Sequence, residues 1–247
     1  MNSMNTMNAM NKESSHKKPL LGIIGGMGTQ ATTAFYEKLH SQQNVTKEQE
    51  YLDVLLYSIP STPDRTAFIT GQSVDNPLSH LIKAAQILEE AGATCIAIPC
   101  VTSHYFYMDI AKEVNIPVLN MLDETAGFVL KKGIKKVNLL ATDGTIKGRF
   151  FHSALQKSGI EVSVPSEENQ HKLMAMIYDI KCGAVISPMV LKTLDSISSD
   201  ALKNGADADI LGCTELCIIA NASSHKLINT LDVLAESALR RVGNTDH

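Results

Sequence analysis

The sequence has neither a long apolar segment nor an excess of basic residues. No apolar run approaches the ~20 residues that a membrane-spanning helix requires. The chain of 247 residues carries a formal net charge of −4, whereas a nucleic-acid-binding surface is typically basic. We therefore expect no membrane partner and no nucleic-acid partner. With 44% hydrophobic and 19% charged residues, the composition indicates a soluble globular protein of one large or two small domains.

Cysteine is too scarce and too irregularly spaced for a disulfide framework. The five cysteines, an odd number, are Cys95, Cys100, Cys182, Cys213 and Cys217. Free thiols are typical of a reducing compartment, so we predict a cytoplasmic protein. The polar residues 1–17, in which Met-Asn recurs, lack the apolar core of a signal peptide, and we predict a disordered tail there.

The sequence also lacks a dinucleotide-binding fingerprint. The apolar run Pro19–Ile24 predicts a strand covered on both faces, residues 25–29 form a glycine turn, and Gln30–Gln42 has helical periodicity. The turn is not GxGxxG, and no acidic residue ends a second strand about 20 residues further on. Strand, glycine turn and helix instead form a place where a small ligand can approach the backbone closely.

Apolar runs and segments of helical periodicity alternate through the rest of the chain, which is the pattern of an α/β fold with parallel sheets. Strands are predicted at 51–59, 95–99, 116–119, 137–141, 161–164 and 209–211. Helices are predicted at 77–91, 102–114, 123–132, 149–158, 170–181, 188–204 and 231–241. The segment 64–66 is expected to lie on a loop, and 142–145 is expected to form a turn.

One α/β unit occurs twice in the chain. Gly28-Thr29 and Phe35-Tyr36 correspond to Gly144-Thr145 and Phe150-Phe151, and Cys100 corresponds to Cys213, at offsets between 113 and 116. We therefore predict two similar Rossmann-like domains with parallel sheets, related by pseudo-twofold symmetry, with the active site in the interdomain cleft. The first domain is expected to comprise residues 18–120 and 223–247, and the second residues 121–222.

Cys100 and Cys213 each lie between an apolar strand and a helix-compatible segment. Backbone N–H groups and the helix dipole at such a position favour thiolate, so we expect these thiols to have a pKa below the ordinary ~8.5. Two thiols on opposite sides of one carbon can remove a proton from one face and return a proton to the other, which inverts a stereocentre. Buried cysteine also occurs as a small apolar residue, and Cys95, Cys182 and Cys217, which lack this setting, are interpreted as core or incidental residues.

Neither a metal nor an organic cofactor is indicated. Cys213 and Cys217 share a helix face, but the sequence shows no partner ligands near them. No lysine follows either of the two strands directly, where a pyridoxal Schiff base would need one. Deprotonation of an amino acid without an electron sink requires fixed hydrogen-bond donors for the charge that develops on its carboxylate. Helix amino termini and glycine-loop amides would supply them.

Five ordered motifs, GIIGGMGxxAT, PDRT, PCxTxH, LLATxGT and LGCTEL, occur between Pro19 and Arg241. In this combination the sequence resembles the aspartate/glutamate racemase family, specifically its pyridoxal-independent aspartate racemase branch. The resemblance implies two Rossmann-like domains, a homodimer, no cofactor, and one catalytic cysteine from each domain at the cleft. It also implies that the ligand is a small acidic amino acid.

The resemblance assigns roles to individual residues. Cys100 and Cys213 correspond to the acid/base pair, Arg65 to the cation that holds the substrate's side-chain carboxylate, and Lys181 resembles a second carboxylate-binding cation. The other substrate-binding positions are Gly26, Met27, Gly28, Thr102 and Thr214, and the supporting positions are Val101, His104 and Glu215. An arginine offers a bidentate fork to a carboxylate. Two simpler interpretations are a surface Arg65 paired with Asp64, and Glu215 as a complement to a helix dipole.

Two positions depart from the family pattern. Val101 stands where the family usually has Asn, so an amide able to bond the substrate is replaced by an aliphatic side chain, and Thr29 replaces a usual Pro. We predict interconversion of L- and D-aspartate, or of glutamate, by two-base thiol/thiolate proton transfer at the α-carbon. The alternatives are an isomerase or decarboxylase of another small dicarboxylate on the same fold, and a non-catalytic protein that binds an acidic amino acid.

Overall fold

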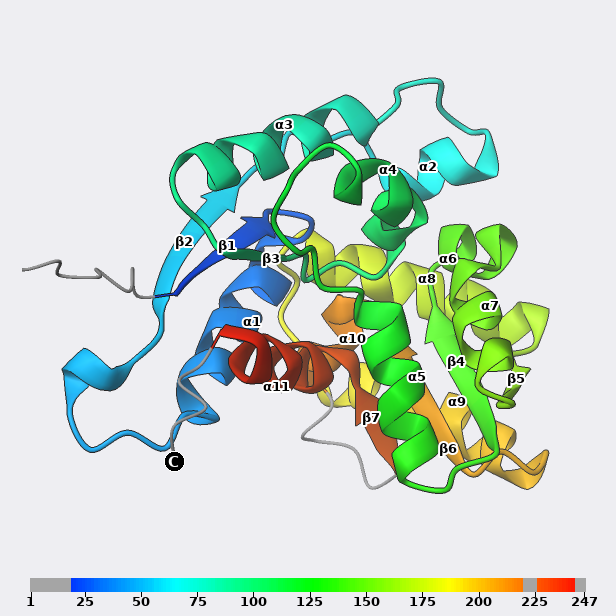
Figure 1. Ribbon diagram of the computed structural model, residues 1–247. Coiled ribbons are helices and arrows are strands. Elements are labelled where there is room, and N and C mark those ends of the chain that lie inside the picture. Colours follow the sequence, from blue (N-terminus) through cyan, green and yellow to red (C-terminus); the bar gives the residue numbers. More distant parts are fainter. Residues whose placement is uncertain (1–18, 220–225, 243–247) are drawn as a thin grey trace, which may run out of the picture.

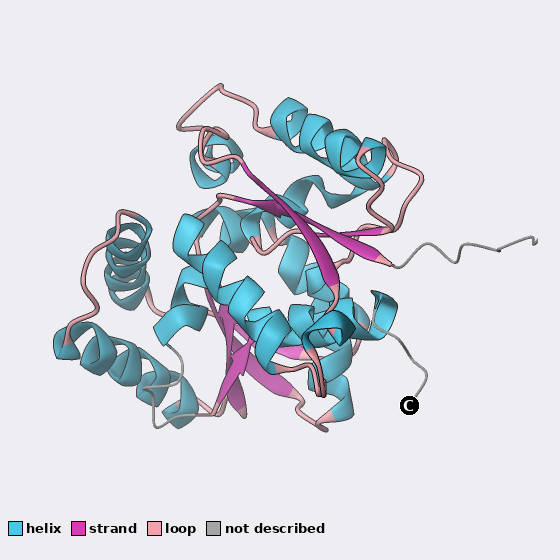
Figure 2. Ribbon diagram, turned by 90° about the vertical axis from the view of Figure 1, so that its left-hand side faces the viewer, coloured by secondary structure: helices cyan, strands magenta, loops and turns pink. Residues whose placement is uncertain are grey.

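Two groups of strands, each with its own helices, make up the structure (Figures 1 and 2). The computed structural model describes residues 19–219 and 226–242, and the predicted tail at 1–17 lies outside the described residues. Strands and helices alternate along both halves of the chain, and every strand pair is parallel. The predicted α/β fold with parallel sheets is confirmed.

The first half of the chain forms a three-stranded sheet. Its strands are β1 (Leu20–Gly25), β2 (Asp53–Ser58) and β3 (Cys95–Ala97), and β1 lies between the other two. Its helices are α1 (Thr29–Ser41), α2 (Arg65–Thr70), α3 (Leu78–Glu90) and α4 (Tyr107–Ala111), with the 3-10 helices η1 (Glu48–Glu50) and η2 (Thr102–Phe106). All of β1 after its first residue is buried, as the continuous apolar run predicts for a central strand covered on both faces.

The second half forms a four-stranded sheet in the order β5-β4-β6-β7. Its strands are β4 (Lys136–Ala141), β5 (Glu161–Ser163), β6 (Ala208–Gly212) and β7 (Leu227–Asn229). Its helices are α5 (Met121–Lys131), α6 (Asp143–Gly148), α7 (Phe150–Lys157), α8 (Glu167–Lys181), α9 (Pro188–Lys203) and α10 (Thr214–Ile219), and α11 (Thr230–Val242) ends the described chain. The central strand β6 is buried at all of its residues.

The duplication predicted from the sequence is visible in the strand order. The first sheet runs β2-β1-β3 and the second runs β5-β4-β6, so equivalent strands occupy equivalent places. Next to β3, a single parallel bridge joins Ile96 to Val118 at the place that β7 takes next to β6. The strand predicted at 116–119 is reduced to this bridge, because Pro117 has no N–H to donate to a strand ladder.

The C-terminal segment does not belong to the first half alone. We predicted residues 223–247 in the first domain, but β7 pairs with β6 in the second sheet, and the sequence pattern did not reveal this three-residue strand. The following helix, α11, packs against both α1 and α5. Figure 1 shows α11 in red between these two helices. The end of the chain therefore connects the two halves.

Two short helices replace a predicted loop and a predicted turn. Asp64 begins α2 by accepting a hydrogen bond from the Ala67 N–H at 2.8 Å. Thr142 begins α6 in the same way through the Thr145 N–H, and such caps contribute about 1 kcal/mol each. Six residues are too few to show helical periodicity in a sequence. The predicted helix at 102–114 is likewise divided into η2 and α4.

Candidate active site

Cys100 and Cys213 occupy equivalent places near the carboxyl ends of β3 and β6. Cys100 lies between β3 and η2, and Cys213 lies between β6 and α10. Both are free thiols, and their side chains are almost fully removed from solvent, at 4% and 3% exposure. The duplication therefore provides one buried thiol at the same point of each half.

The pKa of Cys213 lies well above that of an ordinary cysteine, which contradicts the expectation from the helix dipole. Burial is the largest cause, and the nearby carboxylate of Glu215 adds to it. The Cys213 Sγ donates a hydrogen bond to Glu215 Oε2 over 2.9 Å. Because α10 has only six residues, its dipole is a weak opposing effect. Cys213 is therefore held as a thiol.

Lys181, the last residue of α8, is electrostatically coupled to both thiols. Burial lowers the pKa of its amine, but Glu215, Cys213 and Cys100 raise it by more, so the net pKa lies above the ordinary value of 10.5. Cys100 also contributes to the raised pKa of Cys213. These mutual effects mean that the two thiols, the amine and the carboxylate belong to one cluster.

The glycine turn after β1 lies against this cluster. A Cβ on Gly28 would lie 2.7 Å from Glu215 Oε1 and 3.8 Å from Lys181 Cγ, so a larger residue there would have to displace the carboxylate. Gly26 has a φ of +92°, which favours glycine, and it packs against the chain that follows β2. Met27 is buried in the apolar cluster of the first half, which also contains Cys100.

Arg65, at the start of α2, is a buried cation. Its Nη1 donates hydrogen bonds to the carbonyls of Thr62 and Pro63 at 3.1 and 2.9 Å. Asp64 instead caps α2, and with Arg65 only 7% exposed, the interpretation as a surface charge paired with Asp64 is wrong. Arg65 Nε is a buried donor with no hydrogen-bond partner in the described residues, and its charge acts on Lys181.

Three threonine hydroxyls connect the two halves beside the site. Thr102 Oγ1 lies 3.0 Å from Thr142 Oγ1 and 3.3 Å from Thr145 Oγ1. All three side chains are buried. Sequence reasoning included Thr102 but not Thr142 and Thr145, although the LLATxGT motif and the repeat both mark their position. Thr214, also predicted, is buried with its Oγ1 3.5 Å from Glu215 Oε2.

The contacts of Thr102 and Glu215 repeat the pseudo-twofold relationship. Each of these residues lies two positions after the site cysteine of its own half of the chain. Thr102 contacts Thr142 and Thr145 at the turn after β4. Glu215 lies against Gly28 at the turn after β1. Each cysteine turn therefore packs on the opposite half's strand-turn-helix junction.

His104 fixes the turn that carries Cys100. The Met121 N–H donates to His104 Nε2 at 3.2 Å, so Nδ1 carries the proton and donates to the Cys100 carbonyl over 2.9 Å. Burial is the main cause that lowers the pKa of His104, and the ring is therefore neutral. Because Met121 begins α5, this imidazole ties the Cys100 turn to the start of the second half.

Val101 lies in the apolar core. Its side chain is 1% exposed and belongs to the hydrophobic cluster that also includes Cys213. An aliphatic side chain suits this environment, since a buried amide would need hydrogen-bond partners. Val101 itself has no polar side-chain atom to offer to a ligand.

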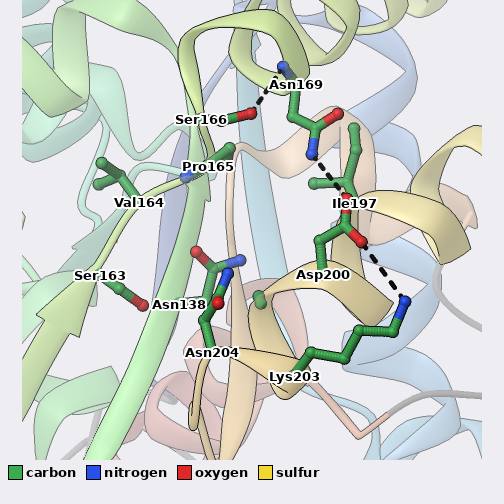
Figure 3. A pocket seen from close by; sticks show the side chains of 11 residues that line it. Asn138, Ser163, Val164, Pro165, Ser166, Asn169, Ile197, Asp200, Lys203 and Asn204 are labelled. Atoms are coloured by element: carbon green, nitrogen blue, oxygen red, sulfur yellow. Dashed lines mark hydrogen bonds and ion pairs between the residues drawn. The ribbon is translucent and has the colours of Figure 1, made fainter.

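A separate cavity of about 280 Å³ lies in the second half, and none of the predicted site residues line it (Figure 3). Residues at the end of β5, the start of α8 and the second half of α9 surround it. Asn169 bonds to Ser166 and to Asp200, and Asp200 pairs with Lys203. These polar groups bond to one another, whereas Arg65 Nε has no hydrogen-bond partner in the described residues.

No helix in residues 19–219 and 226–242 combines the length and the apolar character that crossing a membrane demands. Within the same ranges, three or more His, Cys, Asp or Glu side chains nowhere gather in a way that could hold a metal ion.

Comparisons with known proteins agree with this architecture. Residues 24–238 match the family model described as Asp/Glu/Hydantoin racemase. The broad specificity amino-acid racemase RacX of Bacillus subtilis is 26% identical over 235 residues, which cover 89% of this chain and 96% of that protein. The solved structure of Picrophilus torridus aspartate racemase has a TM-score of 0.81 at 29% identity, with 91% of this chain and 94% of that chain covered. An aspartate racemase homologue from Pyrococcus horikoshii OT3 has a TM-score of 0.70 at 27% identity, with 90% and 98% covered.

Proposed function

This chain belongs to the Asp/Glu/hydantoin racemase family, and we propose that it interconverts L- and D-aspartate with two thiols and without pyridoxal phosphate. The observation that carries this proposal is the cluster in which Cys100, Cys213 and Lys181 act on one another electrostatically. Similarity to two structures described as an aspartate racemase and an aspartate racemase homologue supports aspartate as the substrate. The broad specificity of the Bacillus relative makes glutamate the second candidate.

In this proposal Cys100 and Cys213 act on opposite faces of the substrate α-carbon. The thiolate of one cysteine takes the α-proton, and the electron pair of the broken C–H bond moves toward the α-carboxylate. The thiol of the other cysteine then delivers its proton to the opposite face. The products are the inverted amino acid and a pair of sulfur atoms whose protonation states have been exchanged.

A half-buried cation that acts electrostatically on both sulfur atoms favours this reaction. Lys181 interacts with Cys100 and with Cys213, so its charge stabilises thiolate on either sulfur, before and after the transfer. Electrostatic stabilisation of this kind is stronger in a site that excludes water. The raised pKa of Cys213 suits the acid role, which requires a proton that is bound until the reaction begins.

Two cations, a buried Arg65 and a half-buried Lys181, match the two carboxylates of the substrate. Arg65 has an unpartnered Nε–H donor, and Lys181 remains protonated because its pKa is raised. We assign the side-chain carboxylate to Arg65 and the α-carboxylate to Lys181. A cation beside the α-carboxylate also stabilises the negative charge that develops there when the α-proton leaves.

Proton exchange with solvent tests the proposal. The protein is incubated in D2O with L-aspartate, and separately with L-glutamate, without added pyridoxal phosphate, while the α-proton is followed by NMR and the enantiomers by chiral chromatography. We expect deuterium at the α-carbon and equal amounts of both enantiomers. Binding without exchange would indicate a binding protein, and a new product would indicate an isomerase or a decarboxylase. Either result would overturn the proposal.

A further inference from the structure

Glu215 has a buried carboxylate oxygen that receives no hydrogen bond from the described residues. Its side chain is 2% exposed; Oε2 accepts from the Cys213 thiol, whereas Oε1 has no partner. A buried acceptor left without a donor destabilises the folded protein, and a charged acceptor does so more strongly. The protein maintains this oxygen at the glycine turn, where Gly28 lacks a Cβ that would collide with it.

Few buried polar atoms of the described residues lack a hydrogen-bond partner, and two of them belong to residues that act on the Lys181 amine. In the described part of the chain four such side-chain atoms occur, and one belongs to Arg65 and one to Glu215. Both residues act electrostatically on Lys181. Among the described residues, one unpartnered cationic donor and one unpartnered anionic acceptor therefore belong to residues that act on Lys181.

The charges of the cluster are the inverse of those on an acidic amino acid. Arg65 and Lys181 supply two positive groups and Glu215 supplies one negative group. Aspartate carries two carboxylates and one ammonium, and an ammonium presents three N–H donors. When the cations hold the carboxylates, Glu215 Oε1 is a charged acceptor without a partner in the described residues and is therefore available to the ammonium.

We propose that Glu215 binds the α-ammonium group of the substrate and so selects amino acids over dicarboxylates that lack an amino group. This inference rests on the proposed function, because it assigns a specificity role within that same site. It differs from a role of Glu215 in proton transfer, which would alter turnover without distinguishing ligands by their amino group.

The test compares aspartate with succinate, which is the same dicarboxylate without the amino group. Dissociation constants are measured by calorimetry for the wild type and for Glu215→Gln, with racemic aspartate so that turnover does not change the ligand composition. We expect Glu215→Gln to weaken aspartate binding at least about tenfold, the effect of losing a charged hydrogen bond. Succinate should bind equally well or more tightly, because a negative group has been removed beside a dianion.

A matched control is Glu90→Gln, at the exposed end of α3, which should change neither constant. Equal weakening of both ligands in Glu215→Gln, or no change for aspartate, would refute the inference. If this variant does not fold, the wild type decides alone: aspartate must bind at least tenfold more tightly than succinate, and the reverse order refutes the inference. Failure of the proposed function is separate, since it appears as absent deuterium exchange in the wild type.

Discussion

The Cys213 thiol donates a hydrogen bond to the Glu215 carboxylate over 2.9 Å, at a point where both side chains are almost fully buried. The proton donated in this contact is the one that the Cys213 thiol must lose before its sulfur can act as a base. A neighbouring anion and low solvent exposure both oppose formation of thiolate, and the pKa of Cys213 is raised accordingly. Its reactivity therefore depends on Glu215.

Replacing Glu215 by Gln should make Cys213 easier to ionise. The substitution removes a negative charge next to the sulfur, so the pKa of the thiol should fall and its alkylation should begin at lower pH. The measurement is iodoacetamide labelling between pH 6 and 10, read for each cysteine by peptide mass spectrometry. Cys182, which is exposed, should label alike in both proteins, and an unchanged Cys213 profile would contradict the prediction.

Replacing either proposed catalytic cysteine should abolish racemisation. Cys100→Ser and Cys213→Ser each substitute a hydroxyl that is too weakly acidic to ionise, and loss of a general acid or base costs about 10²–10⁴-fold in rate. The appearance of D-aspartate from L-aspartate, followed by chiral chromatography, gives the rate. The matched variant Cys182→Ser should keep wild-type activity, and full activity in either of the first two variants would disprove its role.

Replacing Lys181 by Gln should weaken the binding of aspartate. A hydrogen bond to a charged group contributes about 1.5–3 kcal/mol, which corresponds to a KM increase of roughly 10- to 150-fold. Lys172→Gln is the control on the same helix, because Lys172 is half exposed and pairs with Glu168. The KM for aspartate, measured by chiral chromatography of the enantiomers, should be higher in Lys181→Gln than in Lys172→Gln. Similar values in both would exclude Lys181 from the site.

Replacing Thr142 by Val should destabilise the protein. Thr142 Oγ1 caps α6 and contacts Thr102 Oγ1 at 3.0 Å across the two halves. The loss of a cap and of a buried partner should lower the free energy of unfolding by about 1–3 kcal/mol. In urea denaturation, Thr33→Val on the exposed face of α1 should stay within about 0.5 kcal/mol of wild type. Equal stabilities would contradict the role assigned to Thr142.

His104 should make the stability of the protein depend on pH below about 6.5. Burial lowers the pKa of His104 in the folded state, so the unfolded chain binds the proton more readily. Stability is then fully present above the unfolded pKa and decreases as the pH falls below it. In His104→Gln this part of the decrease should be absent. Urea denaturation at pH 7.5, 6.5 and 5.5 measures the free energy of unfolding. An equal decrease of this free energy with falling pH in the two proteins would refute the prediction.

The architecture could be predicted from the sequence because its signals are local. Continuous apolar runs identified the β1 and β4 strands, and glycine turns marked the start of α1. The spacing of Cys100 and Cys213 revealed a duplication that the strand orders of both sheets confirm. Short elements were less predictable: α2, α6 and β7 have too few residues for a periodic pattern.

The sequence alone determined the fold class, the duplication and the family, because periodicity, turn residues and ordered motifs are properties of neighbouring positions. Only the tertiary structure decided the ionisation of Cys213, the cross-half contact of Thr102 with Thr142, and the open oxygen of Glu215 beside Gly28. These depend on burial and on groups that are distant in the chain. A thiol's pKa is set by what surrounds it in space, and folding brings those surroundings together.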